Sequence, residues 1–208
     1  MKGLFSRLLI SAILAVAFIG FAAVGAAAGE DDSVTVVDEA SLYSMLESGG
    51  SIKLGCDVVI VDMLTVSKNA EVYLDLCGRT LSTSDEKNVY AINNLGSLVV
   101  TDSVGGGAIR SRGIYNGYDA DGSHITGARL HILSGEYKAM GTNGGSAISN
   151  YASLTIDGGS FTSLGGYSIS AKEGSVSVIN NATVTGGIHN LGALTVNGGE
   201  ISNTRLNS

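Results

Sequence analysis

The sequence predicts an all-β fold, a right-handed parallel β-helix (a solenoid) with one short N-terminal capping helix, and three observations predict it. Ile-x-Asn triplets recur along the chain, and a second motif of alternating apolar residues follows most of them. The 208 residues also include 30 glycines and no proline. Glycine serves tight turns, whereas strands hydrogen-bonded on both sides do not accept proline. These features favour a stack of short paired strands.

The triplets begin at Ile92, Ile114, Ile148 and Ile188, and a related triplet at Ile169 lacks the Asn. Successive intervals are 22, 34, 21 and 19 residues. The second motif alternates apolar and polar residues, as in a strand with one buried face, and then enters a Gly- or Asn-rich turn. Recurrence at about twenty residues is typical of a coil-by-coil solenoid. Its copies are SLVVTD, RLHILSGEY, SLTIDGGSF, SVSVINNATV and ALTVNGGEI.

Stacking of such coils would place the isoleucines in an inner column and the triplet asparagines at a repeated turn. Asparagine tolerates the left-handed conformation of turns, and stacked amides bond to one another in ladders. The predicted ladder consists of Asn94, Asn116, Asn150 and Asn190.

Residues 1–28 are predicted to be a secretory signal peptide. Lys2 and Arg7 precede an apolar run, and Ala26 and Ala28 provide a small-residue cleavage site. The same run is long enough to stay as an uncleaved membrane anchor, which would be the chain's only membrane contact. Either way, the expected location is secreted or at the cell surface.

Residues 29–49 are expected to hold a strand and the capping helix, and residues 50–208 the coils. Leu42, Met45 and Leu46 share one helical face, which would cover the open end of the apolar core. The long interval between coils is explained by an inserted loop at 117–127. Insertions of this kind lie on the side of a solenoid and often carry function.

Charge restricts the classes of partner. Cleavage would remove Lys2 and Arg7 and leave ten basic residues against 19 acidic ones, a net charge of −9. Such a surface repels nucleic acid and anionic lipid, so we expect no nucleic-acid partner.

Several segments resemble a known group. LDLCGRTL at 74–81, LTIDGGSF and LTVNGGEI are similar to the LDLNGKTL and LTIxGG repeats of secreted prokaryotic β-helix proteins in the pectin-lyase-like superfamily. The resemblance implies a right-handed parallel β-helix outside the cell. It leaves activity open, because members include polysaccharide lyases, glycoside hydrolases, adhesins and many proteins without known activity. Cys77 departs from the pattern, since Asn is usual at its position.

The two cysteines, Cys56 and Cys77, lie about one coil apart. Leu54 and Leu76 are expected at equivalent rungs, and adjacent coils are within the range of a disulfide. Two hypotheses stay open: a disulfide, or two reduced thiols in neighbouring layers. No third ligand accompanies them for a metal.

No catalytic, metal or cofactor residue is identified, and the chain is predicted not to be an enzyme. Asp119 and Asp121 faintly resemble a calcium loop but fit a solvated turn better. Arg110 and Arg112 are expected to face outward as ordinary surface residues while Ile109 and Ser111 face inward. The carboxylate clusters required by glycoside hydrolases are not evident in the coils.

The tyrosines admit two interpretations. Five of them fall in or near predicted turns, where they would either stack on sugar rings or cover the edges of coils. They are Tyr115, Tyr118, Tyr137, Tyr151 and Tyr167.

The leading hypothesis is a secreted or cell-surface, adhesin-like structural module that binds extracellular polysaccharide or a surface protein. The alternatives are a carbohydrate-active enzyme on the same scaffold and a fragment of a larger surface protein. An uncapped C-terminal coil would expose strand edges and favour self-association.

Overall fold

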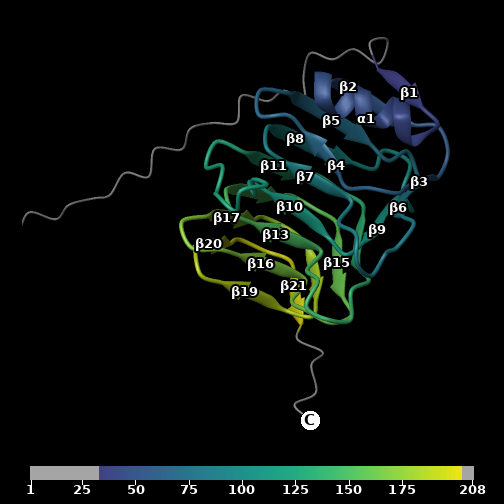
Figure 1. Ribbon diagram of the computed structural model, residues 1–208. Coiled ribbons are helices and arrows are strands. Elements are labelled where there is room, and N and C mark those ends of the chain that lie inside the picture. The colour runs from purple at the N-terminus through teal and green to yellow at the C-terminus, as the bar shows by residue number, and fades with distance from the viewer. Residues whose placement is uncertain (1–32, 203–208) are drawn as a thin grey trace, which may run out of the picture. The chain divides into compact units, whose positions relative to one another are not determined.

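The structure is a computed structural model, and it describes residues 33–202, to which all structural statements refer. The predicted signal peptide, 1–28, lies outside the described residues. The strands form three sheets in which every pairing is parallel, as in the predicted right-handed parallel β-helix (Figure 1). No helix in the described part of the chain is long and apolar enough to cross a membrane.

Each sheet forms one side of the solenoid and receives about one strand from every coil. Sheet A, with eight strands, contains β1 (Val34–Val36), β2 (Gly50–Leu54), β5 (Glu71–Asp75), β8 (Ser97–Thr101), β11 (Arg129–Ile132), β14 (Ser153–Ile156), β17 (Val176–Ile179) and β20 (Ala193–Val196). Sheet B, with seven, contains β3 (Val58–Ile60), β6 (Thr80–Thr83), β9 (Ala108–Ser111), β12 (Glu136–Ala139), β15 (Ser160–Ser163), β18 (Thr183–Thr185) and β21 (Glu200–Ser202). Sheet C, with six, contains β4 (Leu64–Val66), β7 (Ile92–Asn94), β10 (Ile114–Asn116), β13 (Ile148–Asn150), β16 (Ile169–Ala171) and β19 (Ile188–Asn190).

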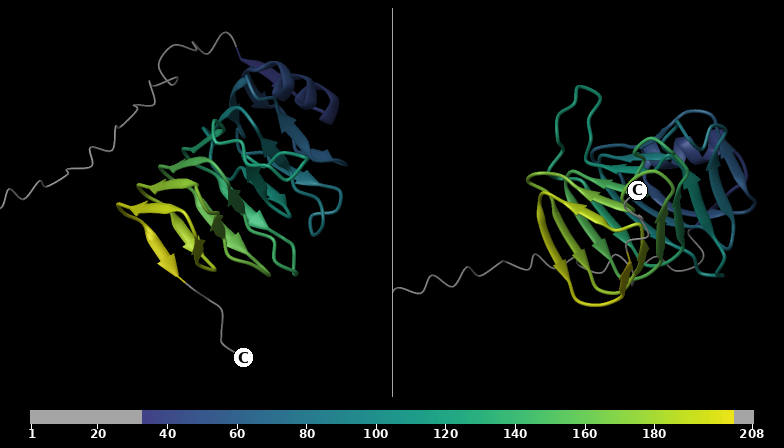
Figure 2. Two further views of the ribbon diagram at one scale, coloured as in Figure 1. Left: turned by 60° about the vertical axis from the view of Figure 1, so that its left-hand side comes forward. Right: turned by 90° about the horizontal axis from the view of Figure 1, so that it is seen from below.

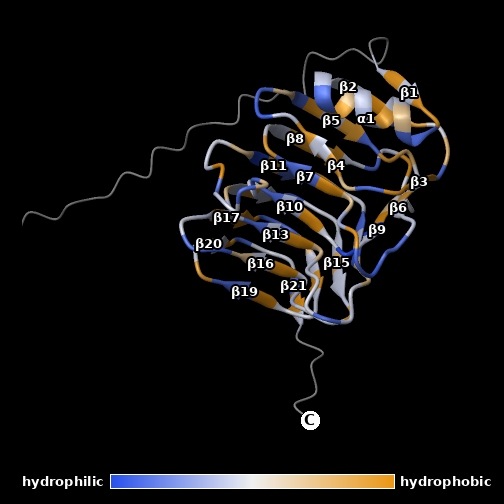
Figure 3. Ribbon diagram, viewed as in Figure 1, coloured by the Kyte–Doolittle hydropathy of each residue, from blue (hydrophilic) through white to orange (hydrophobic). Residues whose placement is uncertain are grey.

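The predicted isoleucine column is confirmed by the register of sheet C. Ile114 pairs with Ile92 on one side and with Ile148 on the other, and Ile169 continues the column to Ile188. The first four of these side chains are at most 1% exposed. Because period-2 alternation turns every second side chain inward, each coil adds a thin aliphatic layer to the core (Figure 3).

Tyr137 corrects one expectation of the sequence. It was predicted either to stack on a sugar ring or to cover the edge of a coil, but it points into the core from β12 and is 1% exposed. Its ring stacks on Phe161 of the next coil, with centroids 4.9 Å apart and an angle of 9° between the ring planes. The phenol hydroxyl donates to the backbone oxygen of Ser134 at 2.9 Å, so the one polar atom of the side chain is satisfied inside the core.

Helix α1 (Glu39–Ser48) packs against β2, β3 and β4 at the N-terminal end of the stack (Figure 1). Leu42 and Leu46 are fully buried there, while Met45 is partly buried against the same core. The Asp38 carboxylate caps the helix by accepting the backbone N–H of Ser41 at 2.8 Å. The amphipathic pattern therefore places the helix over the first coil.

The turn after β5 contains a backbone conformation that is unusual for its residue. Cys77 has φ 49° and is the sole described non-glycine residue with positive φ, and Gly78 follows with φ 74°. The N–H of Arg79 donates to the Leu76 oxygen at 2.8 Å and closes a tight turn of type I′. Left-handed backbone costs about 1–2 kcal/mol in a residue with a Cβ, which is why Asn-Gly is preferred there.

The insertion at 117–127 forms a small hairpin that projects from the side of the stack (Figure 2). Tyr118 and His124 face each other in an antiparallel bridge. The base of the hairpin is held to the coils by an ion pair between Lys68 and Asp119, with Nζ and Oδ2 2.8 Å apart, and by a bond from Asn93 Nδ2 to the Tyr118 oxygen at 2.7 Å. The inserted residues thus stand beside sheet C.

The last described coil exposes positions that are buried one coil earlier. Val196 pairs with Ile179 and Ile201 with Val184, yet Val196 and Ile201 are 45% and 43% exposed whereas both partners are fully buried. Among the described strands, β19, β20 and β21 each have a neighbour on one side only.

Candidate functional site: a tyrosine groove on sheet C

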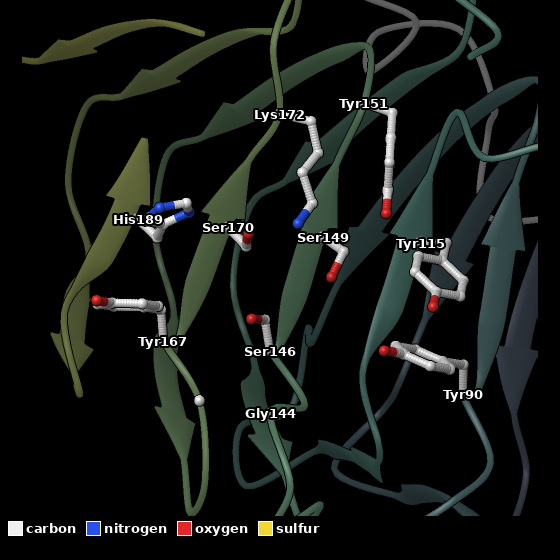
Figure 4. A pocket seen from close by; sticks show the side chains of 11 residues that line it. Tyr90, Tyr115, Gly144, Ser146, Ser149, Tyr151, Tyr167, Ser170, Lys172 and His189 are labelled. Carbon is white, nitrogen blue, oxygen red and sulfur yellow. The ribbon is translucent and has the colours of Figure 1, made fainter. Parts of the chain in front are cut away.

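The outer face of sheet C forms a groove with aromatic ends and a hydroxyl floor. Apart from two glycines, its residues occupy three columns defined by their distance in sequence from an isoleucine of the buried column: two positions before it, one position after it, and three positions after it. We call this hollow the tyrosine groove (Figure 4). It is lined by Tyr90, Tyr115, Gly144, Ser146, Ser149, Tyr151, Gly166, Tyr167, Ser170, Lys172 and His189.

The columns follow from parallel pairing in register. Tyr115 pairs with Ser149, which pairs with Ser170, which in turn pairs with His189. These residues alternate with the buried isoleucines and therefore share the outer face. This column therefore has an aromatic ring at each end, Tyr115 and His189, and two serines between them.

The aromatic cluster at the N-terminal end of the groove contains Tyr90, Tyr115, Tyr118 and Tyr151. Tyr90 and Tyr115 are stacked with ring centroids 3.9 Å apart, and Tyr115 stacks on Tyr118 at 4.9 Å. Tyr118, from the insertion, lies 5.1 Å from Tyr151, also between centroids. The hairpin therefore extends this aromatic wall beyond the coils.

A smaller aromatic pair stands at the other end. Tyr167 and His189 stack with centroids 5.1 Å apart and an angle of 25° between their planes. Figure 4 shows Ser146, Ser149 and Ser170 between this pair and Tyr90 with Tyr115, and shows the Lys172 side chain reaching over the same floor. Between the two walls lie the three serines and the longer Lys172 side chain.

Burial raises the pKa of two groove phenols, those of Tyr115 and Tyr151. Burial and, secondarily, a hydrogen bond with Tyr90 raise the pKa of Tyr115 well above its usual range. The pKa of Tyr151 is also raised, by burial first and then by the charges of Tyr90 and Tyr118 in their ionised forms. At neutral pH these side chains therefore offer apolar faces and neutral hydroxyls, not a tyrosinate base.

Three of the four predicted ladder asparagines are joined directly. Asn94 Nδ2 donates to Asn116 Oδ1 and Asn116 Nδ2 to Asn150 Oδ1, each at 2.8 Å. Asn190 is separate, because Ala171 occupies the intervening coil, and it donates to the Gly192 oxygen at 2.9 Å on the surface. The ladder is internal, so it supports the turn below the groove and does not face a ligand.

Cys56 and Cys77 are both free thiols. The pairing of β2 with β5 ends at Lys53 and Asp75, so both cysteines lie in the turns beyond it. Cys56 Sγ donates to the Val37 oxygen at 3.2 Å, and Cys77 Sγ lies 3.9 Å from Ser103 Oγ. Of the two hypotheses, the structure therefore shows free thiols, each in contact with a different part of the chain.

The two acidic residues of the insertion have local partners. Asp119 pairs with Lys68, and Asp121 Oδ1 accepts the backbone N–H of Ser123 at 2.8 Å. Within the described residues, no three His, Cys, Asp or Glu side chains gather as a metal-binding group.

The arginines of β9 and the following turn alternate with buried neighbours as expected. Ile109 and Ser111 are buried, while Arg110 and Arg112 are half-buried. Arg110 forms an ion pair with Glu86, with Nε and Oε1 3.2 Å apart. Arg112 instead lies over the ring of Tyr90, with Cζ 5.2 Å from the centroid. One arginine is thus structural and the other borders the tyrosine groove.

A second polar row lies on another face. His131 Nε2 lies 2.6 Å from Asp157 Oδ2, and Asn180 Nδ2 donates to Asp157 Oδ1 at 2.6 Å. Asn197 continues the row by donating to Asn180 at 2.7 Å. Burial alone would raise the pKa of Asp157, but the bonds from Asn180 and His131 lower it. The repetition of one such contact in each coil marks this row as an external ladder that holds the turns together.

Sequence reasoning missed Tyr90 and the serines. Tyr90 stands two positions before the isoleucine of its triplet, the position that Tyr167 holds three coils later. Alignment of the triplets on their isoleucines would have placed these residues in one row, so the signal was present in the repeat itself.

Comparison of the chain with protein-family models, with curated proteins and with solved structures finds no match.

Proposed function

We propose that this chain is an extracellular or cell-surface β-helix module, adhesin-like and without enzymatic activity, whose tyrosine groove binds a glycan. The observation that carries the proposal is the placement of two aromatic walls around a floor of hydroxyls. Sugar rings present apolar faces edged by hydroxyl groups. Tyrosine has the same division, an apolar ring with one polar tip, and serine hydroxyls both donate and accept.

The size of the groove suits an extended ligand. It crosses four strands of sheet C, from Tyr115 on β10 to His189 on β19, and neighbouring strands are about 4.8 Å apart. Three such steps span about 14 Å, the length of a short oligosaccharide. A glycan would therefore lie across the strands, with one residue near each wall.

The composition of the groove favours binding over hydrolysis. Glycoside hydrolysis by the common mechanisms uses two carboxylates on either side of the scissile bond. The residues that line the groove include no Asp and no Glu. A carbohydrate-active enzyme on this scaffold is the alternative, and it would have to place its acids on another face.

Membership of the pectin-lyase-like superfamily and an extracellular location are part of the proposal. The parallel sheets and the LDLCGRTL and LTIDGGSF segments support the first. The N-terminal apolar run supports the second.

A glycan array probed with the full chain tests the proposal, followed by calorimetry on the glycans that bind. We expect Tyr151→Ala and Tyr167→Ala each to weaken binding roughly two- to tenfold, since loss of one aromatic contact removes about 0.5–1.5 kcal/mol. Tyr73→Ala is the matched control, because Tyr73 lies on β5 in sheet A. Thermal melts establish that each variant is folded.

Two results would overturn the proposal. One is the absence of any bound glycan, and the other is equal weakening by the groove variants and the control. The enzymatic alternative is tested by assay of sugar release and of unsaturated product on a polysaccharide panel. Activity that copurifies with the chain would replace the binding proposal.

A further inference from the structure

A second hollow borders the tyrosine groove and is basic. It is lined by Lys87, Asn88, Arg112, Thr142 and Asn143, and we call it the basic pocket. Two observations connect it to the groove. Arg112 lies over the ring of Tyr90, a groove residue, and Asn143 directly precedes Gly144, another. The two hollows therefore adjoin at these residues.

We propose that this combined surface takes an acidic glycan, whose carboxylate or sulfate groups are bound by Lys172 and Arg112. This inference rests on the proposed function and names the class of its ligand. The two lining sets contain Lys87, Arg112 and Lys172 but no Asp or Glu. The contrast with the whole chain is sharp, because the chain has 19 acidic residues against 12 basic ones.

Both cations stand beside aromatic faces. Lys172 Nζ is 5.7 Å from the ring centroid of Tyr151, and Arg112 Cζ is 5.2 Å from that of Tyr90. Figure 4 shows the Lys172 side chain directed toward the side of the groove where the serines lie. A sugar stacked on either ring would thus carry its anionic substituent next to a positive charge, and charge-assisted bonds are the stronger kind.

The acids next to Lys87 in sequence have other partners: Glu86 pairs with Arg110, and Asp85 accepts the Asn88 side-chain amide at 2.8 Å. Glu173 directly follows Lys172, is exposed, and does not line either hollow. Neither Lys172 nor Arg112 forms an ion pair with a described residue. Their charges are therefore not neutralised within the described part of the chain.

Paired ligands test the inference. Each acidic oligosaccharide is compared with a neutral partner, made by reduction of its carboxylates to alcohols or by removal of its sulfates. We expect at least one acidic member to bind about tenfold more tightly than its partner, and this preference to shrink as salt is raised from about 0.05 to about 0.5 M. The carboxylate and sulfate arms distinguish the two anions.

Charge-neutral variants assign the preference to residues. We expect Lys172→Gln and Arg112→Gln each to reduce it several-fold while affinity for the neutral partner changes little. Lys53→Gln is the control, because it removes the same charge from β2 in sheet A.

The outcomes separate the two proposals. Equal affinity for acidic and neutral partners overturns this inference and leaves glycan binding intact. A preference that persists in the Lys172→Gln, Arg112→Gln double variant also overturns it. Binding of neither partner overturns the proposed function, and the inference with it.

Discussion

The side-chain amide of Asn94 donates a hydrogen bond to the side-chain oxygen of Asn116 at 2.8 Å, although 22 residues separate them in sequence. The second Asn94 amide hydrogen goes to the backbone oxygen of Arg129, also at 2.8 Å. One side chain thus fixes the register of its own coil against the next. Asn116 repeats the arrangement with Asn150, so coil register is set by polar groups as well as by aliphatic packing.

We expect Asn116→Ala to lower the free energy of unfolding by about 2–4 kcal/mol, because it removes both ladder bonds and leaves buried partners unsatisfied. Urea denaturation measures the loss. Asn190→Ala, which changes the same side chain on the surface, should cost less than about 0.5 kcal/mol. Similar losses in both variants would show that the ladder has no special role.

Cys77→Asn is expected to stabilise the fold by about 0.5–1 kcal/mol. The left-handed backbone at Cys77 suits Asn better than Cys, and Asn-Gly is the favoured pair for this turn. The measurement is the midpoint of chemical denaturation, with Cys56→Ser as the control for loss of a thiol. A destabilised Cys77→Asn variant would mean that the sulfur contact with Ser103 matters more than the backbone.

The pH dependence of stability should include a contribution from Asp75. Asp75 is 4% exposed as a residue, and its carboxylate oxygen Oδ1 accepts the N–H groups of Cys77 and Ser103 at 2.9 and 3.0 Å. Burial opposes ionisation, but these bonds outweigh it and lower the pKa in the folded state.

The unfolded chain therefore binds more protons than the folded chain in the interval below the ordinary Asp pKa of about 3.9. The stabilisation is complete above that pH and is lost as pH falls through the lower folded pKa. Asp75→Asn keeps an acceptor oxygen without the charge, so its melting temperature should fall less between about pH 5 and pH 2. Asp62→Asn, at an exposed position, should follow the parent protein. A parallel decline in all three would exclude Asp75 as a source.

We expect the chain of 208 residues to self-associate through its last described coil, because Val196 and Ile201 are exposed there beside described edges of β19, β20 and β21. Helix α1 covers the first coil, so two copies would meet through their last described coils instead of adding head to tail. Light scattering over a concentration series should show dimers, and Val196→Glu with Ile201→Glu should shift them to monomers. Val104→Glu, at a residue 73% exposed elsewhere, is the control. A protein that stays monomeric throughout would refute this prediction.

The sequence predicted the fold well because the same apolar pattern recurs in every coil, and that pattern determines how the coils pair. Once Ile92, Ile114, Ile148 and Ile188 were recognised as equivalent, parallel pairing followed, and the structure shows that pairing. The missing Asn at position 171 was visible as well. A ladder bond joins only adjacent coils, so the alanine at position 171 leaves Asn190 without a ladder partner on that side.

Details of the turns and of side-chain direction could not be predicted. Cys56 and Cys77 lie beyond the paired residues of β2 and β5, where a spacing of about one coil does not determine which side chains meet. The tyrosine groove combines positions from several coils, so no local motif contains it. Tyr137 is a tyrosine like those of the groove, but its side chain points inward. Its place in the inward–outward alternation of β12 determines that direction.

Each coil is hydrogen-bonded only to the coils before and after it, so the coils can separate one at a time from an end. Tension applied at the β21 end would act on one row of backbone bonds at a time, and coils would detach in succession instead of in one cooperative event. The early coils, held under α1, would be the last to yield. A tethered molecule of this kind would lengthen stepwise under load while its earlier turns stayed folded.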